Sequence, residues 1–320
     1  MRKLLTLFCL MGVATAVLAE NQGDDGYTLV FSDEFDQADG SLPDATKWAA
    51  STRRSSTWNR WISSSPEVAY IRDGALVCRA IPNPDTSTDN VPMITGAMET
   101  KGRFSFTYGK VEVRLKTNRH KGNFPAAWMM PQPPADSWPA GGEIDIFESI
   151  DAQNTAYHTI HTHWTYTLGY KNYPKSSFSE WMDVENWHVY GLIWEPERLV
   201  WTVDGNEVGR YEKSTIQYSL DNGQWPFDHA FYLILNQSVG NGSWAANADT
   251  EYTYETHFDY VRVYQKATSG IDNLRREGSA SQKTFDLQGR EVASVQDFSA
   301  DTSTLPKGIY VVNHRKFVVK

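Results

Sequence analysis

Short segments rich in β-branched and aromatic residues follow one another over residues 27–266, and turn residues separate them. In GKVEVRLK, the apolar Val111, Val113 and Leu115 alternate with charged residues, as in an antiparallel strand with one buried face. The dipeptide Asp204-Gly205 lies between two strand patterns and predicts a tight hairpin turn. No long apolar stripe with the helical period interrupts this series. The sequence therefore predicts an all-β fold, a β-sandwich of two antiparallel sheets.

The composition is that of an acidic globular protein. The 320 residues carry a formal net charge of −9, 40% of them are hydrophobic, and they include 12 Trp and 16 Tyr. An acidic surface repels nucleic acid and anionic lipid, so neither is expected as a partner. The many aromatic residues fit either a large core or stacking platforms in a groove, and composition alone does not choose between the two.

The N-terminus has the features of a secretory signal peptide. MRKLLTLFCLMGVATAVLAE begins with basic residues, continues with an apolar run and closes on a small-residue cleavage pattern. We therefore predict a signal peptide over residues 1–19 and a secreted protein, extracellular or at the cell surface. Cys9 lies within this peptide, so Cys78 has no intramolecular disulfide partner in the mature chain. No other stretch is long and apolar enough to span a membrane, and no membrane insertion is expected.

The composition changes towards the C-terminus. Residues 267–282 are rich in Ser, Gly and charged residues, which predicts a linker between a sandwich domain over residues 20–266 and a small C-terminal β domain over residues 283–320. The segments FDLQGREV and LPKGIYVV resemble the C-terminal sorting domain of bacterial type IX secretion cargo. The resemblance implies export across the outer membrane by a secretion machinery. A small module that only stabilises the protein is the alternative.

The stretch GGEIDIFES, residues 141–149, combines three carboxylates with apolar residues. On a regular strand Glu143 and Asp145 point to one face, whereas Glu148 points to the other face with the apolar side chains. A β-bulge at Ile146-Phe147 would turn all three carboxylates to one face and leave apolar residues toward the core. Because bulges often redirect a side chain beside an active site, this irregularity predicts a functional site.

The expected spacing of these carboxylates suits glycoside hydrolysis. Glu143 and Glu148 would lie about four strand steps apart, ~13 Å between Cα atoms, and their side chains could bring the carboxyl groups to roughly 5–6 Å. Retaining glycosidases require about 5–5.5 Å and inverting ones about 6.5–9.5 Å, so the estimate favours retention and leaves inversion open. Three neighbouring carboxylates cannot all ionise without cost, so at least one pKa should rise. Asp145 could share a hydrogen bond with Glu143 and help to keep the acid protonated.

GEIDIFE, together with Trp128 upstream in PAAWMMP, resembles the catalytic strand of glycoside hydrolase family 16 in its bulged form, E-x-D-x-x-E. The resemblance extends from FSDEFD to FDYVRVYQ and so covers most of the sandwich domain. It implies a jelly-roll sandwich with a concave sugar-binding cleft and a retaining mechanism. In that mechanism Glu143 is the nucleophile, Glu148 is the acid/base, and Asp145 assists.

The same resemblance assigns roles outside this strand. It places His161 near the carboxylates, and Trp128 and Trp244 along the cleft. Family members often carry a calcium ion, for which Glu34 and Asp259 are the expected ligands. No cofactor is required for the chemistry itself.

Residue types alone point to further contacts with a sugar. Trp beside Asn and Arg in a polar loop suits the apolar face and the hydroxyl rim of a sugar, and side-chain amides are further partners for hydroxyl groups. These candidates are Trp58, Asn59, Trp61, Asn236 and Gln237. Expected to serve packing or structure instead are Trp187, Trp194, Trp201, His158 and His163.

Two alternatives come from other functional classes. His161 and His163 in HTH would share one strand face and, with a carboxylate, could hold Zn, Mn or Fe as in a cupin-like metalloenzyme. The third ligand would be Glu180 or His188, although neither has a convincing spacing. The other alternative is a non-catalytic carbohydrate-binding sandwich, which would not need three aligned carboxylates.

The residues specify the reaction better than the substrate. The family resemblance covers hydrolysis of β-glucans, galactans and host glycans. YHTIHTHWTYTLGY and NQSVGNGSW look more like gut-bacterial members acting on poly-N-acetyllactosamine of mucin-type glycans, or on mixed-linkage glucans, than like typical laminarinases. The sequence therefore favours an endo-β-galactosidase, with a β-1,3(4)-glucanase as the alternative. It leaves open the linkage, endo or exo action, and the oligomeric state.

Overall fold

The computed structural model describes residues 26–266 and, nearer the C-terminus, residues 282–285, 291–295, 308–312 and 315–319. The chain divides into two compact units, Met1–Lys266 and Ala267–Lys320. The predicted signal peptide (1–19) and almost all of the predicted linker (267–282) lie outside the described residues.

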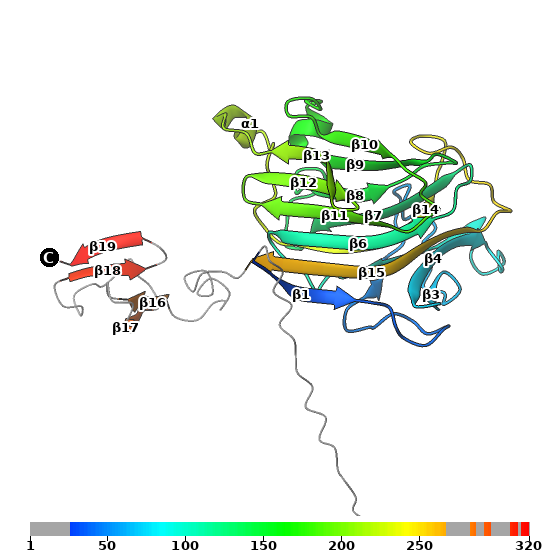
Figure 1. Cartoon of the computed structure of the whole chain (residues 1–320), viewed down its shortest axis with the longest axis horizontal. Helices are drawn as coiled ribbons and strands as arrows, with labels where there is room; N and C mark the ends of the chain where they lie inside the picture. Colours follow the sequence, from blue (N-terminus) through cyan, green and yellow to red (C-terminus); the bar gives the residue numbers. More distant parts are fainter. Residues whose placement is uncertain (1–25, 267–281, 286–290, 296–307, 313–314, 320) are drawn as a thin grey trace, which may run out of the picture. The chain divides into compact units, whose positions relative to one another are not determined.

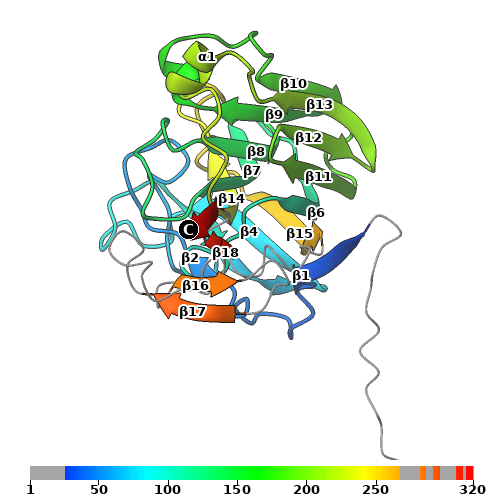
Figure 2. The same cartoon turned by 90° about the vertical axis from the view of Figure 1, so that its left-hand side faces the viewer.

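Fifteen strands in the described part of the larger unit belong to one hydrogen-bonded sheet, and the main path of this sheet folds back on itself where β4 pairs with β5 (Figure 1). One layer has the order β4-β15-β6-β11-β12-β13, with β1 beside β15 and β3 beside β4. The other has the order β10-β9-β8-β7-β14-β5, with β2 beside β5. The predicted all-β sandwich is thus confirmed, as a jelly roll with its two sheets joined at one side (Figure 2). The strands are β1 (Tyr27–Asp33), β2 (Ala49–Ala50), β3 (Ala69–Arg72), β4 (Ala75–Pro82), β5 (Met93–Glu99), β6 (Gly109–Thr117), β7 (Asn123–Pro131), β8 (Glu143–Glu148), β9 (Thr155–His161), β10 (Ser177–Trp181), β11 (His188–Glu195), β12 (Arg198–Val203), β13 (Asn206–Glu212), β14 (Phe231–Val239) and β15 (Tyr254–Lys266).

Local sequence patterns explain the β6 strand and the β12–β13 hairpin. On β6, buried and half-buried residues alternate along the whole strand, as the sequence predicts. Val203 pairs with Asn206, so only Asp204 and Gly205 connect β12 to β13. Both connecting residues have positive φ angles, 48° and 81°, as a tight turn matched to the twist of its strands requires.

The space between the two layers is filled by one large apolar core. Its largest buried side chains include Trp194 of β11 and Trp201 of β12, which confirms their predicted packing role. Trp187 is half-buried instead, with the charged ends of Arg114 and Lys116 each 4.9 Å from its ring centroid. The sandwich is therefore stabilised by aromatic side chains that face inward, while other aromatics are left for the outer faces.

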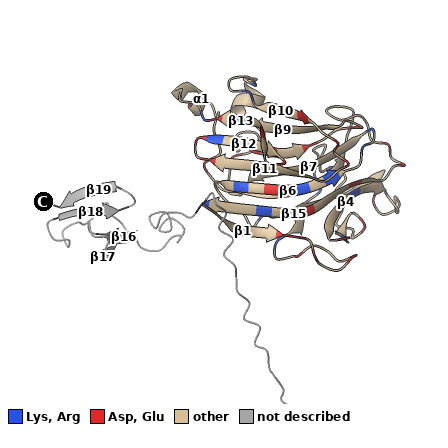
Figure 3. Ribbon diagram, in the orientation of Figure 1, with Lys and Arg blue, Asp and Glu red and all other residues tan. Residues whose placement is uncertain are grey.

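The outer face of the β15-β6-β11 layer is charged, with both signs interspersed (Figure 3). Of the predicted calcium ligands, Asp259 lies on β15 and Glu34 directly follows β1. Glu34 accepts two hydrogen bonds from Arg262, at 2.9 and 2.7 Å, and Asp259 accepts one from Arg114 at 2.6 Å. Within the described residues neither carboxylate joins a group of three or more potential ligands. Each carboxylate is thus paired with an arginine, and the calcium site at Glu34 and Asp259 stays a prediction.

Two short helical segments complete the larger unit, the π-helix η1 (His163–Thr167) and the helix α1 (Gln217–Asp221). In the described part of the chain, neither these nor any other helix has the length and apolarity that a membrane crossing needs. The smaller unit contains a four-stranded antiparallel sheet with the order β17-β16-β18-β19. These strands are β16 (Gln282–Phe285), β17 (Glu291–Val295), β18 (Gly308–Val312) and β19 (Arg315–Val319).

Candidate functional site

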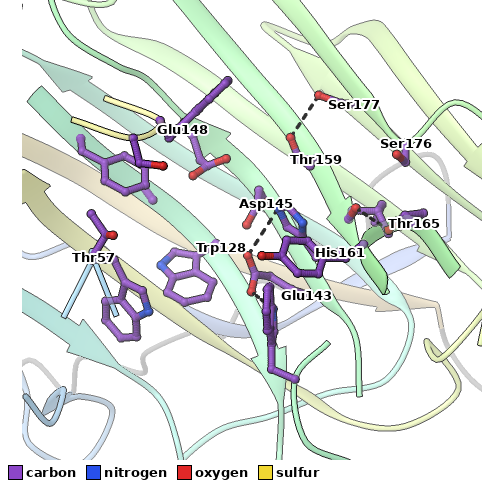
Figure 4. A pocket seen from close by; sticks show the side chains of 18 of the residues that line it. Thr57, Trp128, Glu143, Asp145, Glu148, Thr159, His161, Thr165, Ser176 and Ser177 are labelled. Atoms are coloured by element: carbon purple, nitrogen blue, oxygen red, sulfur yellow. Dashed lines mark hydrogen bonds and ion pairs between the residues drawn. The ribbon is translucent and has the colours of Figure 1, made fainter. Parts of the chain in front are cut away.

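The strand β8 contains the predicted β-bulge. Its register against β9 pairs Asp145 with Thr159 and then Glu148 with Tyr157, so two residues of β8 stand opposite one residue of β9. Ile146 and Phe147 are the residues inside this irregularity, and both are completely buried. Glu143, Asp145 and Glu148 instead line one cleft on the outer face of the sheet (Figure 4). The geometric prediction from the sequence is confirmed.

Two hydrogen bonds stabilise the unusual backbone of β8, and a glycine is required where the chain enters this strand. His158 Nδ1 donates a hydrogen bond of 2.7 Å to the carbonyl of Ile146, which lies within the bulge. From the opposite sheet, Trp201 Nε1 donates a hydrogen bond of 2.8 Å to the carbonyl of Asp145. Gly142 precedes the strand with a φ of +88°, and a Cβ atom there would lie 2.9 Å from the ring of Phe227. Side chains of the neighbouring strand and of the core therefore donate to the backbone of the bulge, and Gly142 permits the chain to enter β8 in its left-handed conformation.

The cleft has a volume of about 690 Å³. Its floor is formed by β7, β8, β9 and β14, and loops supply its walls. Of the predicted site residues, it contains the three carboxylates together with Trp58, Trp128, His161, Asn236 and Trp244. Its remaining lining residues are Thr57, Phe124, Ala126, Trp138, Thr159, Ile160, Thr165, Tyr166, Lys171, Ser176, Ser177, Asn241 and Ser243.

The carboxylates differ in their hydrogen-bond partners. Trp138 Nε1 donates a hydrogen bond of 2.6 Å to Glu143 Oε2. His161 Nε2 lies 3.4 Å from Asp145 Oδ2 and 3.8 Å from Glu143 Oε1. No hydrogen-bond donor contacts Glu148 among the described residues. Negative charge is thus stabilised best at the Glu143 end of the group.

The pKa values of all three carboxyl groups are raised. Burial, followed by repulsion from Asp145, raises the pKa of Glu143 to about 8, although Trp138 and His161 act in the opposite direction. Burial raises the pKa of Asp145 to about 8, and a hydrogen bond with Glu143 opposes the shift. Burial and then repulsion from Asp145 raise the pKa of Glu148 well above its usual value. The group therefore retains protons at neutral pH, and it can present an ionised carboxylate beside a protonated one.

Aromatic side chains line both ends of the cleft. Trp58 packs edge-on against Trp128 at a centroid distance of 4.8 Å, and Trp244 is 49% exposed. Near Glu143, the exposed rings of Trp138 and Tyr166 lie 4.5 Å apart. Such rings can stack on the apolar faces of successive sugars.

Asn236 lines the cleft, but its side chain already has protein partners. Its oxygen accepts a hydrogen bond of 2.7 Å from Trp128 Nε1, and its amide donates one of 2.9 Å to Ser238. Asn236 therefore orients the ring of Trp128, which is nearly buried.

Three predicted sugar contacts are wrong in their placement. Gln237 points to the opposite face of β14 from Asn236, where it is buried and hydrogen bonds Asn123 and Thr256. Asn59 is buried and does not line the cleft. Trp61 packs on a separate apolar cluster that contains Ala80, Met93, Val239 and Tyr254, and the guanidinium of Arg60 covers its ring.

The His-x-His metal site predicted as an alternative is not assembled. β9 ends at His161, and Thr162 caps the helix η1 that begins at His163. Consequently the two histidines do not share a strand face. Glu180 is exposed on β10, and His188 pairs with Asp204 at 2.7 Å, so neither candidate third ligand lines the cleft.

A different group in the cleft has the residue types of a metal site. Potential ligand atoms of Glu143, Asp145 and His161 all lie within 4.8 Å of one another, and no other such group exists in the described ranges. These carboxylate oxygens and this imidazole nitrogen also share protons and hydrogen bonds with one another. A divalent cation would therefore compete with protons for them.

Sequence reasoning missed Trp138, Tyr166 and Lys171 as cleft residues. Trp138 stands five residues before Glu143, in ADSWPAGGE, and this proximity is a signal that could have identified it. Tyr166 and Lys171 lie on the segment between β9 and β10, and the sequence pattern predicts a strand only as far as His163 in this part of the chain. His158 is buried and contacts the bulge, in agreement with a structural role.

Comparison with known proteins agrees with this geometry. Residues 77–261 match the description "Glycosyl hydrolases family 16". In sequence, the chain is similar to "Keratan-sulfate endo-1,4-beta-galactosidase" of Sphingobacterium multivorum, with 36% identity over 248 residues that cover 75% of this chain and 55% of that protein. The chain thus spans about half the length of this relative.

The solved structures similar to this chain have related names. One is SCLam, "a non-specific endo-beta-1,3(4)-glucanase from family GH16", with a TM-score of 0.65, 32% identity, and coverage of 76% of this chain and 92% of SCLam. Another belongs to the work "Prominent members of the human gut microbiota express endo-acting O-glycanases to initiate mucin breakdown", with a TM-score of 0.63, 27% identity, and coverage of 74% and 98%.

Proposed function

Because the chain belongs to glycosyl hydrolase family 16, we propose that its cleft hydrolyses internal β-glycosidic bonds of a polysaccharide or glycan with retention of configuration. The observation that carries this proposal is the bulge in β8, which turns Glu143, Asp145 and Glu148 toward one cleft. Aromatic side chains on both sides of these carboxylates provide the surfaces on which a chain of sugars can lie.

The two glutamates have different roles in the proposed double displacement. Glu143 attacks the anomeric carbon, while Glu148 gives its proton to the oxygen of the leaving sugar. Glu148 then removes a proton from the water that hydrolyses the covalent intermediate. The hydrogen bond from Trp138 supports Glu143 as the ionised partner, and the raised pKa of Glu148 supports it as the acid. Asp145, between them, exchanges a proton with Glu143 and so adjusts its charge.

The proposed substrate is poly-N-acetyllactosamine of mucin-type glycans, cleaved by endo-β-galactosidase activity. This choice is supported by the names of the similar galactosidase and of the similar gut-bacterial O-glycanase structure. A β-1,3(4)-glucanase is the second candidate, because SCLam has a similar fold and 32% identity. Incubation with desulfated keratan, mucin O-glycans, laminarin and mixed-linkage glucan, followed by mass spectrometry of the products, distinguishes these candidates. If the protein cleaves none of these four substrates, the proposed function is contradicted.

Substitutions test the roles of the carboxylates. We expect Glu143→Gln and Glu148→Gln each to lower kcat by roughly three orders of magnitude or more, with unchanged thermal stability or a small increase. Glu180→Gln, which removes an exposed carboxylate on β10 outside the cleft, is the matched control. With an activated substrate, azide should rescue Glu143→Gly to an α-glycosyl azide and Glu148→Ala to a β-glycosyl azide. The same anomer from both variants would refute the assignment.

For the C-terminal unit we propose a sorting role in type IX secretion, together with export directed by the N-terminal signal peptide. The resemblance of the last strands to sorting domains supports this role. The test is expression in a bacterium with this secretion system, with and without residues 283–320. Equal amounts of extracellular protein from the two forms would contradict the proposal, since the deletion should retain the enzyme in the periplasm.

A further inference from the structure

Hydroxyl groups and aromatic rings share the β9–β10 side of the cleft. Thr159 and Ser177 supply the hydroxyl groups of its floor. The rings are those of Trp244, which packs on Tyr157 of β9 at a centroid distance of 5.1 Å, and of Tyr166, which lies 5.9 Å from the ring of His161. A sugar over Thr159 and Ser177 would meet hydrogen-bonding groups beside these rings.

The hydroxyl groups continue a row of polar side chains that crosses three strands. Asp145 of β8 pairs with Thr159 of β9, and Thr159 pairs with Ser177 of β10. The two hydroxyl oxygens lie 3.3 Å apart, and a dashed line in Figure 4 marks this contact. Because paired residues point to the same face of a sheet, this row leads from the carboxylates to the rim of the cleft at β10.

Lys171 is located at this side of the cleft. Of the described residues that line the cleft, it is the only lysine or arginine. Its side chain is exposed, and no carboxylate within the described ranges forms an ion pair with it. It is also absent from the main causes of the raised pKa values of Glu143 and Glu148, whereas His161 is among them. Its positive charge is thus available to a ligand in the cleft.

The backbone that carries Lys171 is tightly held. The carbonyl of Lys171 accepts hydrogen bonds from both the amide (2.9 Å) and the hydroxyl (3.1 Å) of Ser176. Trp164 stacks on Tyr170 at a centroid distance of 4.1 Å and donates a hydrogen bond of 2.9 Å to the carbonyl of Tyr173. These contacts fix the loop on both sides of Lys171, which lowers the entropic cost of using its charge in binding.

We propose that Lys171, with the hydroxyl groups of Thr159 and Ser177, forms a subsite for an anionic substituent of the substrate. The substituent is a sulfate ester or a carboxylate on a sugar that occupies the β9–β10 side of the cleft. A cation can pair with its charge, and hydroxyl groups can donate to its remaining oxygens. This inference rests on the proposed function, because it assumes that the cleft binds a glycan.

Binding measurements on the full-length Glu148→Gln protein test the subsite without interference from turnover. The probes are a keratan oligosaccharide bearing sulfate, the same oligosaccharide after chemical desulfation, and a sialylated N-acetyllactosamine oligosaccharide. We expect at least one charged probe to bind roughly fivefold more tightly than the neutral one at low salt, as a partly exposed charge-assisted contact allows. Which probe shows the gain tells whether the anion is a sulfate or a carboxylate. The gain should shrink at about 0.5 M salt.

Three substitutions at two lysines test whether the positive charge of Lys171, rather than the shape of its side chain, causes the difference in affinity between the probes. Lys171→Met should bring charged and neutral probes to within about twofold of each other, and Lys171→Arg should preserve most of the difference. Lys175→Met is the matched control, because Lys175 belongs to the same loop but lies over the ring of Phe178, outside the cleft lining. It should leave all affinities unchanged.

The inference is overturned if charged and neutral probes bind the parent protein equally, if none of them binds, or if Lys171→Met weakens all probes to the same extent. The proposed function is tested separately by whether the wild-type enzyme cleaves any of the four substrates named above, of which desulfated keratan is the neutral counterpart of the charged probe. An enzyme that cleaves this chain with no preference for charge would retain the proposed function and lose the subsite.

Discussion

The buried histidine next to the bulge gives a quantitative prediction on stability. His158 is completely buried, its Nδ1 donates to the carbonyl of Ile146, and its Nε2 has no hydrogen-bond partner in the described structure. Burial lowers the pKa of His158 from 6.5 to about 4. The unfolded chain therefore takes up a proton below about pH 6.5 that the folded protein takes up only near pH 4.

The sign of the effect follows from this difference. The contribution of His158 is fully present above the unfolded pKa and is lost as the pH falls from 6.5 toward 4. At ~1.4 kcal/mol for each pKa unit, the complete loss is about 3 kcal/mol, and about 2 kcal/mol of it occurs between about pH 7 and pH 5. In His158→Gln the amide can still donate to Ile146 but cannot take up the proton. Its free energy of unfolding should therefore fall by about 2 kcal/mol less than that of the parent over this range.

Urea denaturation of both proteins at several pH values measures this double difference, in which the other titrating groups cancel. His163→Gln, at a half-buried histidine outside the core, controls for the loss of an imidazole as such. His158→Leu should in addition leave the Ile146 carbonyl unsatisfied, cost about 1–3 kcal/mol at pH 7 and lower turnover through a relaxed bulge. Parallel pH dependence in the parent and His158→Gln would refute the reasoning.

Three further predictions concern the carboxylates and their neighbours. Trp138→Phe removes the hydrogen-bond donor to Glu143, so the pKa of Glu143 should rise. The acid limb of the kcat/KM profile should then move to higher pH by roughly one unit, and an unchanged acid limb would contradict this prediction. Because burial and repulsion from Asp145 raise the pKa of Glu148 well above 4.5, the alkaline limb of the pH–rate profile, where this acid loses its proton, should lie well above pH 4.5. Added Zn²⁺ should inhibit by binding Glu143, Asp145 and His161, EDTA should reverse the inhibition, and His161→Ala should weaken it at least about tenfold; equal inhibition of both proteins would speak against the site.

The bulge could be predicted from sequence because its cause is local. Alternation on a strand is strict, so an acid at the i+5 position either faces the core or requires an extra residue. The apolar Ile146 and Phe147 supply that residue, and both are buried as the pattern demands. The same rule of alternation identifies β6, and the Asp204-Gly205 turn depends on nothing beyond the two residues themselves.

Other features depend on contacts between residues that are far apart in the sequence. Either Asn236 or Gln237 could face the cleft, and the choice is set by Asn123 and Thr256, which hydrogen bond Gln237 from other strands. The strand pattern in HTHW is ended by the capping hydrogen bonds of Thr162, which compete with continued pairing. Alternation therefore predicts that neighbouring residues of a strand point to opposite faces of the sheet. It does not predict which of two polar neighbours points to the cleft.

Loop residues were predicted least well, because their positions depend on the path of the chain rather than on a period. Trp138 and Lys171 reach the cleft from loops before β8 and before β10. The Trp-rich loop near residue 58 illustrates the opposite error. Of its aromatic side chains Trp58 lines the cleft, whereas Trp61 turns to a separate apolar cluster.

The position of the carboxylates is coupled to the core of the sandwich through Trp201. This residue belongs to β12 in the other sheet, is completely buried, and donates its indole N–H to the backbone of Asp145. A bulge breaks the regular ladder, so the carbonyls of Asp145 and Ile146 need donors other than strand neighbours if they are to remain buried. Trp201 and His158 supply these donors from two directions. Because an indole in the packed core cannot shift without opening a cavity, the spacing of Glu143 and Glu148 is fixed by the same packing that stabilises the fold.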